Sequence, residues 1–194
     1  MSGSSARARL AQRILQALDP AVVPETLRRF GRPPSVALPS SSQQLVLVGQ
    51  RGAGKTTLLP LVGELLERPG VDLDEEIARI HGRALLDWVR EDPVSFRSAE
   101  RSTFQGLQPP AVVAAGGGFL FLHGELLLPH VAVLVPISFE TCRSRLLQDT
   151  TRPRLRPELT LEEEIRSVFF EREAAHLESP AIHLGDFLRA AVDA

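Results

Sequence analysis

The amino-acid sequence predicts one α/β domain in three layers (α/β/α), with helices on both sides of a parallel sheet of about five strands and a short helical extension at the N-terminus. A chain of 194 residues, 43% hydrophobic and 24% charged, has the composition of one domain with a core. Short continuous apolar runs alternate with helical patterns from residue 44 onward. A glycine-rich loop joins the first of these runs to a helical pattern.

The overall charge and composition exclude several classes of function. The net charge is -2, so the chain lacks the cationic field that binding to nucleic acid or to an anionic membrane surface requires. No apolar run approaches the roughly 18 residues needed to cross a bilayer, and the N-terminus lacks the apolar stretch of a secretory signal. The single cysteine, Cys142, cannot form an internal disulfide and is expected to be a small buried hydrophobe. We expect a cytoplasmic monomer without nucleic-acid or membrane partners.

Residues 1–43 form the predicted extension. Apolar residues recur there at helical spacing and predict one short amphipathic helix: Leu10, Ile14, Leu15 and Leu18. Prolines at 33–34 and the polar stretch 39–44 indicate a linker, so the domain is predicted over residues 44–194. We expect the helix to pack on the domain or on a partner subunit. An organellar transit peptide and the remnant of a nucleic-acid-binding arm are the alternatives.

The strands and helices of the domain follow from the period of its apolar residues. Runs of β-branched and aliphatic residues bounded by glycine, proline or acidic residues are typical of strands buried on both faces. They cover 44–49, 70–74, 111–116, 131–136 and 181–184. Helical patterns cover 55–67, 74–92, 94–106, 138–148 and 160–178. Strands that alternate with helices predict βαβ units and a parallel sheet.

The loop GQRGAGKT at residues 49–56 fits the pattern G-x-x-x-x-G-K-[ST] between a predicted strand and a predicted helix. Backbone N–H groups of such a loop, with the positive end of the following helix, bind phosphate. Its lysine, Lys55, is the only one among 22 basic residues. A compact, mobile ammonium can follow a transferring phosphoryl group, whereas an arginine fork is larger and stiffer. We predict a nucleoside triphosphate site; a glycine-rich turn that matches by chance is the alternative.

The predicted nucleotide-binding residues lie within and directly after this loop. They are Gly49, Gly52, Ala53, Gly54, Lys55, Thr56 and Thr57. In this motif the hydroxyl of Thr56 is a ligand for Mg²⁺. The motif does not identify the molecule that receives the phosphoryl group.

Two carboxylates mark the end of the second predicted strand. Asp72 and Asp74 flank Leu73 there, and open parallel sheets bind their ligands at the carboxyl ends of strands. Two carboxylates at this place suit a metal-bound water or a substrate hydroxyl. An aspartate at a strand end is also a common helix N-cap, which is the alternative for Asp74.

Two further motifs place polar or small residues where a site is expected. Arg97 and Glu100 are one helical turn apart, so Glu100 can orient the guanidinium of Arg97; a solvated surface pair is the alternative. Glycines 116–118 follow the third predicted strand, where missing side chains let a ligand approach the backbone.

The helical pattern at 160–178 begins with a capping box formed by Thr160 and Glu163. Its apolar stripe continues to Arg172. An arginine on such a stripe either extends to solvent at the edge of the core or binds an anion inside a cleft.

With these motifs in this order, the chain resembles the shikimate kinases, small P-loop enzymes that transfer the γ-phosphate of ATP to the 3-hydroxyl of shikimate. The resemblance covers about residues 44–184. Besides the phosphate loop it includes DLD at 72–74, FRSAE at 96–100, AAGGG at 114–118, TRPRL at 151–155 and FEREAAH at 170–176. It implies a P-loop kinase fold, ATP and Mg²⁺ as cofactors, and a step in aromatic amino-acid biosynthesis.

The resemblance also implies roles for single residues. Lys55, Asp74 and Arg152 are implied to be catalytic: Asp74 binds the hydroxyl that is phosphorylated and is the candidate base, and Arg152 closes over the ATP phosphates from a mobile lid. Asp72 is implied to place Mg²⁺ through water, beside Thr56. The shikimate site is implied to consist of Asp74, Arg97, Glu100, Gly117, Gly118 and Arg172, with the two arginines on the substrate carboxylate.

Two positions depart from the family pattern. His176 stands where the family often has a tyrosine, and Arg154 occupies a lid position that is usually aliphatic. Two alternative functions therefore stay open: a kinase of a related small hydroxy acid, and a ligand-sensing regulatory module that joins a helix-turn-helix unit to a shikimate-kinase-like domain. The single helix predicted in residues 1–43 argues against the second, because a helix-turn-helix unit needs two helices.

Overall fold

The structure, a computed structural model, describes residues 2–194, with side chains from residue 6 onward. In chain order its elements are α1 (Ser2–Ala17), the 3₁₀ turn η1 (Pro20–Val22), α2 (Val23–Phe30), β1 (Leu45–Val48), α3 (Lys55–Leu66), β2 (Gly70–Asp72), α4 (Leu73–His81), α5 (Leu85–Glu91), α6 (Pro93–Gly106), β3 (Val112–Ala114), α7 (Phe119–His123), η2 (Gly124–Leu127), β4 (Val131–Leu134), α8 (Phe139–Gln148), α9 (Leu161–Glu178), β5 (Ile182–His183) and α10 (Leu184–Asp193).

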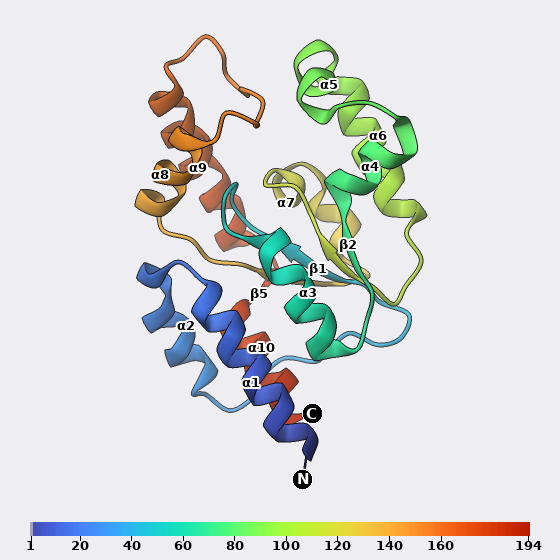
Figure 1. Cartoon of the computed structure of the whole chain (residues 1–194), viewed down its shortest axis with the longest axis vertical. Helices are drawn as coiled ribbons and strands as arrows, with labels where there is room; N and C mark the ends of the chain where they lie inside the picture. The colour runs from blue at the N-terminus through green and yellow to red at the C-terminus, as the bar shows by residue number, and fades with distance from the viewer. Residues whose placement is uncertain (1) are drawn as a thin grey trace.

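The strands form one parallel, 5-stranded sheet in the order β2-β3-β1-β4-β5 (Figure 1). Leu45 of β1 lies opposite Val112 of β3 on one side and opposite Val131 of β4 on the other. All four residues of β1 are buried, as expected for a central strand with both faces covered. The predicted parallel α/β sheet is confirmed.

Each face of the sheet has its own layer of helices. Leu45 and Leu47 of β1 point into the core shared with α1, α3, α8, α9 and α10. Val46 and Val48 point the other way, into the core shared with α4, α5, α6 and α7. This alternation is the two-residue period of a strand, and it produces the predicted three layers. In Figure 1, α4 to α6 and the pair α8 and α9 rise on opposite sides above the carboxyl end of β1.

The extension contains two helices, whereas the sequence predicts one helix and a linker. The second helix, α2, has a proline at its second position. A proline usually interrupts a helical pattern in a sequence, but in the first turn of a helix it is tolerated. Contacts with a distant segment hold it in place: Arg29 Nη1 donates to Asp186 Oδ2 of α10 at 2.9 Å. A Cβ added at Gly185 would lie 2.5 Å from the carbonyl oxygen of Thr26, so α2 and α10 meet backbone to backbone.

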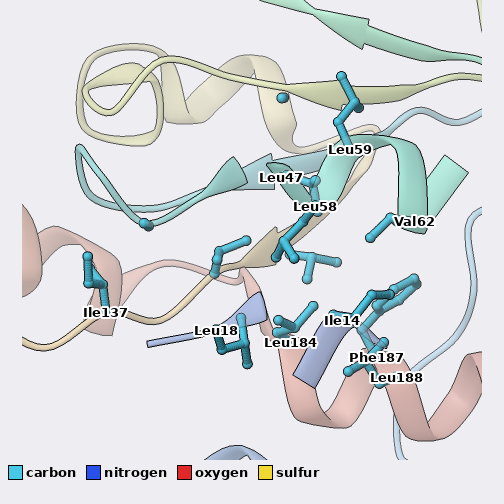
Figure 2. Close-up of a cluster of buried hydrophobic side chains, with 14 of the residues drawn as sticks. Ile14, Leu18, Leu47, Leu58, Leu59, Val62, Ile137, Leu184, Phe187 and Leu188 are labelled. Carbon is cyan, nitrogen blue, oxygen red and sulfur yellow. The ribbon is translucent and has the colours of Figure 1, made fainter. Parts of the chain in front are cut away.

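The first helix, α1, is part of the central core. Ile14 and Leu18 lie between α3 and α10, close to Leu58, Leu184 and Phe187 (Figure 2). Ile14 is fully buried. Residues 1–43 therefore share one core with the domain that follows them.

Two other differences concern helix boundaries. The helix predicted over 74–92 is divided: α4 is terminated by Gly82, whose φ of +62° is left-handed and favours glycine, and α5 begins at Leu85. Helices α7 and α10 are absent from the predicted set, and α10 follows β5 directly. None of the helices within residues 2–194 combines the length and the apolar character that a membrane span needs.

Candidate active site

A cleft of about 700 Å³ lies at the carboxyl ends of the strands. The phosphate loop between β1 and α3 forms its floor, α5 and α6 line one side, and α8 with the segment that follows it lines the other. Every site residue predicted from the sequence except Gly49 lines this cleft. The chain therefore brings residues from positions 52 to 172 together around one cavity.

Lys55 is the first residue of α3 and is held inside the phosphate loop. Its Nζ donates to the carbonyl of Gly49 at 2.9 Å and to that of Gln50 at 2.8 Å. Burial, followed by the positive charge of Arg152, lowers the pKa of Lys55 to about 8. The only lysine of the chain is thus directed at the place where the loop binds phosphate.

Gly49 lies behind the loop. Its φ is +136°, and an added Cβ would lie 2.6 Å from the carbonyl oxygen of Val135. Only glycine lets the end of β1 pass this close to the chain after β4. Gly49 therefore shapes the loop and accepts a hydrogen bond from Lys55.

Thr56 and Asp72 face each other across the base of the cleft. Thr56 Oγ1 donates to Asp72 Oδ2 at 2.7 Å, while Asp72 Oδ1 accepts the N–H groups of Asp74 at 3.0 Å and Glu75 at 3.3 Å. Asp72, and not Asp74, is therefore the N-cap of α4.

The donor set at this place fits Mg²⁺. A hydroxyl and a carboxylate oxygen are hard ligands of the kind that this ion prefers. Within residues 6–194, no three His, Cys, Asp or Glu side chains lie close enough to bind a metal by themselves. Such a sparse set suits an ion that keeps several waters and is bound largely by substrate phosphates.

Asp74 projects its carboxylate into the cleft beside two other acids. Burial raises the pKa of Asp74 to about 6, and the negative charges of Asp72 and Glu100 contribute in the same direction. A carboxylate with a raised pKa in a cleft is a candidate for acid–base chemistry.

Glu100 organises the acceptor side of the cleft. Its side chain is 1% exposed, and Oε2 accepts from Arg97 Nη1 at 2.8 Å and lies 3.2 Å from His123 Nε2. Burial alone would raise the pKa of Glu100, but His123 and Arg97 lower it below its usual value. Arg97 is half-buried and paired with a fully buried carboxylate, so the two residues are not the solvated surface pair. Sequence reasoning missed His123, because its helix α7 is too short to give a helical pattern.

The three glycines after β3 make room for charged side chains. An added Cβ would lie 3.1 Å from Glu100 Oε1 at Gly116, 2.6 Å from Arg51 Cγ at Gly117 and 2.9 Å from Arg172 Nη2 at Gly118. Side chains at these positions would displace the groups that line the cleft.

Arg172 reaches the same glycines from α9. Its Nη1 donates to the carbonyl of Gly117 at 2.9 Å. Burial, with the nearby positive charges of Arg51 and Arg97, lowers the pKa of Arg172 to about 10. This arginine lies inside the cleft and not at the edge of the core, so the anion-binding interpretation is the one that the geometry supports.

The segment between α8 and α9, residues 149–160, is called the lid segment below. Arg152 projects from it into the cleft, and its Nε donates to Asp149 Oδ2 at 2.6 Å. Arg154, the unusual residue of this segment, faces α9 instead, where its Nε donates to Glu164 Oε2 at 2.6 Å. Glu164 is completely buried and also accepts the backbone N–H groups of Leu155 and Arg156.

Arg51 is the main site residue that sequence reasoning missed. Its Nη2 donates to the carbonyl of Pro153 at 3.1 Å, and its Nη1 lies 3.5 Å from Glu164 Oε1. It thus connects the phosphate loop to the lid segment. In the sequence, Arg51 is marked only as a charged residue at one of the unspecified positions of the loop pattern. Behind it, the Sγ of Cys142 donates to the Arg51 carbonyl at 3.2 Å.

Comparisons with known proteins agree on one family. The sequence model of the family described as "Shikimate kinase" matches residues 51–188. A curated shikimate kinase of Rhodopirellula baltica is 30% identical over 151 residues, which cover 73% of this chain and 81% of the relative. "Shikimate kinase 2" of Shigella dysenteriae serotype 1 is 32% identical over 149 residues, which cover 71% and 83%.

Solved structures give the same result. The shikimate kinase from Acinetobacter baumannii in complex with shikimate has a TM-score of 0.65 at 28% identity, and the match covers 78% of this chain and 87% of the other. The shikimate kinase from Aquifex aeolicus has a TM-score of 0.62 at 23% identity, with 78% and 92% covered, which supports the fold alone.

Proposed function

The chain belongs to the shikimate kinase family, and we propose that it transfers the γ-phosphoryl group of ATP to the 3-hydroxyl of shikimate, giving shikimate 3-phosphate and ADP. Like the other enzymes of this family it uses ATP and Mg²⁺. The 3-hydroxyl acceptor and a place in aromatic amino-acid biosynthesis are the specific parts of the proposal.

One observation carries the proposal. A phosphate loop, a carboxylate, the buried Arg172 and the half-buried Arg97 face one cleft. A phosphoryl acceptor that has both a hydroxyl and a carboxylate matches these groups, because guanidinium groups bind carboxylates in a fixed orientation. Arg97, oriented by Glu100, and Arg172 are assigned to the substrate carboxylate, and Gly117 and Gly118 to the wall beside the ring.

The assigned mechanism is positioning and charge stabilisation, the usual means of phosphoryl transfer. Asp74 orients the attacking hydroxyl and accepts its proton. Lys55 and Arg152 stabilise the negative charge on the transferring group. Thr56 and Asp72 would hold Mg²⁺, which neutralises phosphate charge when bound. Arg51 keeps the lid segment against the phosphate loop, and a closed lid excludes water that would compete for the phosphoryl group.

The structure gives no support to the alternative functions considered from the sequence. Neither Arg154 nor His176 is among the described residues that line the cleft, which favours shikimate over a related hydroxy acid as the acceptor. Residues 1–43 do contain two helices, but each packs on other elements: α1 on α3 and α10, and α2 on α10. They do not form the helix pair that a helix-turn-helix unit requires.

The direct test is ADP release by the full-length protein with ATP and Mg²⁺, with and without shikimate. We expect release that depends on shikimate and disappears in Lys55→Ala. Mass spectrometry and phosphorus NMR of the product identify the phosphorylated hydroxyl. ATP binding without shikimate-dependent release, or a phosphate on another hydroxyl, would contradict the proposal.

Arg97→Ala tests the carboxylate contact. Loss of a charged hydrogen bond of about 1.5–3 kcal/mol should raise the KM for shikimate roughly tenfold or more and leave the KM for ATP unchanged. The matched control is Arg101→Ala, one turn further along α6, because Arg101 is exposed and pairs with Glu125 outside the cleft. Equal shikimate constants in both variants would remove Arg97 from the substrate site.

A further inference from the structure

The C-terminal end of α1 reaches the cleft, although no role described above uses it. Ala17, the last residue of α1, lines the cleft together with Gly52 and Ala53 of the phosphate loop and Arg145 and Leu146 of α8. The match to the family model begins at residue 51, so this part of the wall comes from outside the region that the family shares.

The position of Ala17 relative to the reacting groups indicates which part of ATP lies beside it. In phosphoryl transfer the acceptor and the leaving group lie on opposite sides of the transferring phosphoryl group. Asp74 and Arg97 define the acceptor side, where α5 and α6 line the cleft. The nucleoside of ATP must therefore extend away from Asp74, and the elements on that other side are α8 and the end of α1.

The end of α1 is fixed relative to α8. Asp19, two residues after Ala17, is 2% exposed, and its Oδ2 accepts from Ser138 N at 2.8 Å and from Ser138 Oγ at 2.7 Å. Ser138 is the N-cap of α8, the helix that carries Arg145 and Leu146. Leu18, next to Ala17, is buried in the core (Figure 2). In Figure 1 this end of α1 points toward the start of α8. The wall is therefore rigid and does not depend on a mobile loop.

We propose that the C-terminal end of α1 forms one wall of the nucleoside-binding part of the ATP site, with Ala17 against the base. The N-terminal extension is then a component of the nucleotide site. This inference rests on the proposed use of ATP but not on the identity of the acceptor.

The test compares Ala17→Leu with Gln16→Leu as the matched control. Both side chains are exposed at the end of the same helix, but Gln16 does not line the cleft. Dissociation constants are measured without shikimate for ATP, for ADP and for inorganic tripolyphosphate, which lacks the nucleoside. The larger side chain introduced by Ala17→Leu occupies space that the base requires. Ala17→Leu should weaken ATP and ADP binding about tenfold and leave tripolyphosphate binding unchanged, and the control should match the wild type.

Equal ATP affinity in Ala17→Leu and Gln16→Leu would overturn the inference. A parallel loss of tripolyphosphate binding would do the same, because it would mean that the substitution disturbs the phosphate loop. Since shikimate is absent from these measurements, a protein that binds ATP as expected but does not phosphorylate shikimate would contradict the proposed function alone.

Photolabelling provides a second readout that needs no substitution. Irradiation of the full-length protein with 8-azido-ATP attaches the label to residues beside the base. After trypsin digestion we expect label on the peptide from Ile14 to Arg28, which contains Ala17, and protection by excess ATP. Protectable label confined to other peptides would overturn the inference.

Discussion

His176 is a buried imidazole on α9 at the position where the family often has a tyrosine. It is 7% exposed, and its Nε2 has no hydrogen-bond partner among the described residues. Burial lowers its pKa to about 4, and the positive charges of Lys55 and Arg172 contribute. The folded protein therefore requires the neutral form of this histidine.

This requirement predicts a pH dependence of stability. The pKa of His176 is about 4 in the folded chain and 6.5 in its reference state, so the unfolded chain takes up the proton first as the pH falls. Its contribution to stability is complete above pH 6.5 and is lost between pH 6.5 and about 4. We expect the fall in Tm from about pH 7.5 to about pH 5 to be smaller in His176→Phe than in the wild type. Equal falls would show that His176 does not titrate in this way.

Single residues of the site could be predicted from sequence because each belongs to a short motif of neighbouring residues. Which of Asp72 and Asp74 caps the helix and which faces the cleft could not be predicted, because either aspartate can be a helix N-cap. The structure decides it: Asp72 accepts two N–H groups of α4 and leaves the carboxylate of Asp74 to the cleft. Partners far away in sequence, such as His123 for Glu100, leave no local signal either.

Among the elements, the lid segment depends on one buried carboxylate. Glu164 of α9 receives the side chain of Arg154 and the backbone N–H groups of Leu155 and Arg156. Arg154, at a position that is usually aliphatic in the family pattern, thus gives the lid segment an ionic contact. Loss of the Glu164 carboxylate would leave these two backbone N–H groups without an acceptor, so the contact is sensitive to substitution.

Glu164→Ala should loosen the lid segment and lower the free energy of unfolding by about 1.5–3 kcal/mol, the range for loss of hydrogen bonds to a charged group. Trypsin should then cleave faster after Arg154 in the native protein, because Arg154 precedes a leucine whereas Arg152 and Arg156 each precede a proline. Glu162→Ala is the control: Glu162 lies on the same helix, is exposed and pairs with Arg143. Cleavage rates that are equal in the two variants would show that Glu164 does not hold the lid.

Strands and long helices could be predicted because their apolar periods are local, whereas short helices could not. The division between α4 and α5 depends on the left-handed turn at Gly82, which a continuous helical pattern conceals. The helices α2 and α10 are each stabilised by the other, through contacts between residues more than a hundred positions apart. The helix propensity of a short stretch of sequence contains no information about such distant contacts.

At the scale of the whole molecule, the extension and the domain share one hydrophobic core. The layer of helices on one face of the sheet includes α1, whose Ile14 is fully buried beside Leu58 and Phe187. The sequence pattern shows that α1 is amphipathic but not which surface it covers. The domain boundary placed between residues 43 and 44 therefore does not separate two cores.

Ile14→Ala should lower the free energy of unfolding by about 2–5 kcal/mol, the range for removal of a large buried aliphatic side chain. The loss should appear in a single unfolding transition of the whole protein, measured by urea denaturation. Gln12→Ala, on the exposed side of α1, is the control and should leave the midpoint almost unchanged. Two separate transitions would show that the extension unfolds independently.

The buried position of Cys142 makes the sole thiol of the chain a natural reporter of opening. Its Sγ donates to the carbonyl of Arg51, directly behind the phosphate loop, and burial raises the pKa of the thiol to about 11. A disulfide reagent added to the native enzyme can react only when α8 and the loop separate. The rate of that reaction, followed at this single sulfur atom, measures how often the phosphate site opens. The decrease in the rate when ATP is bound measures how strongly the nucleotide keeps the site closed.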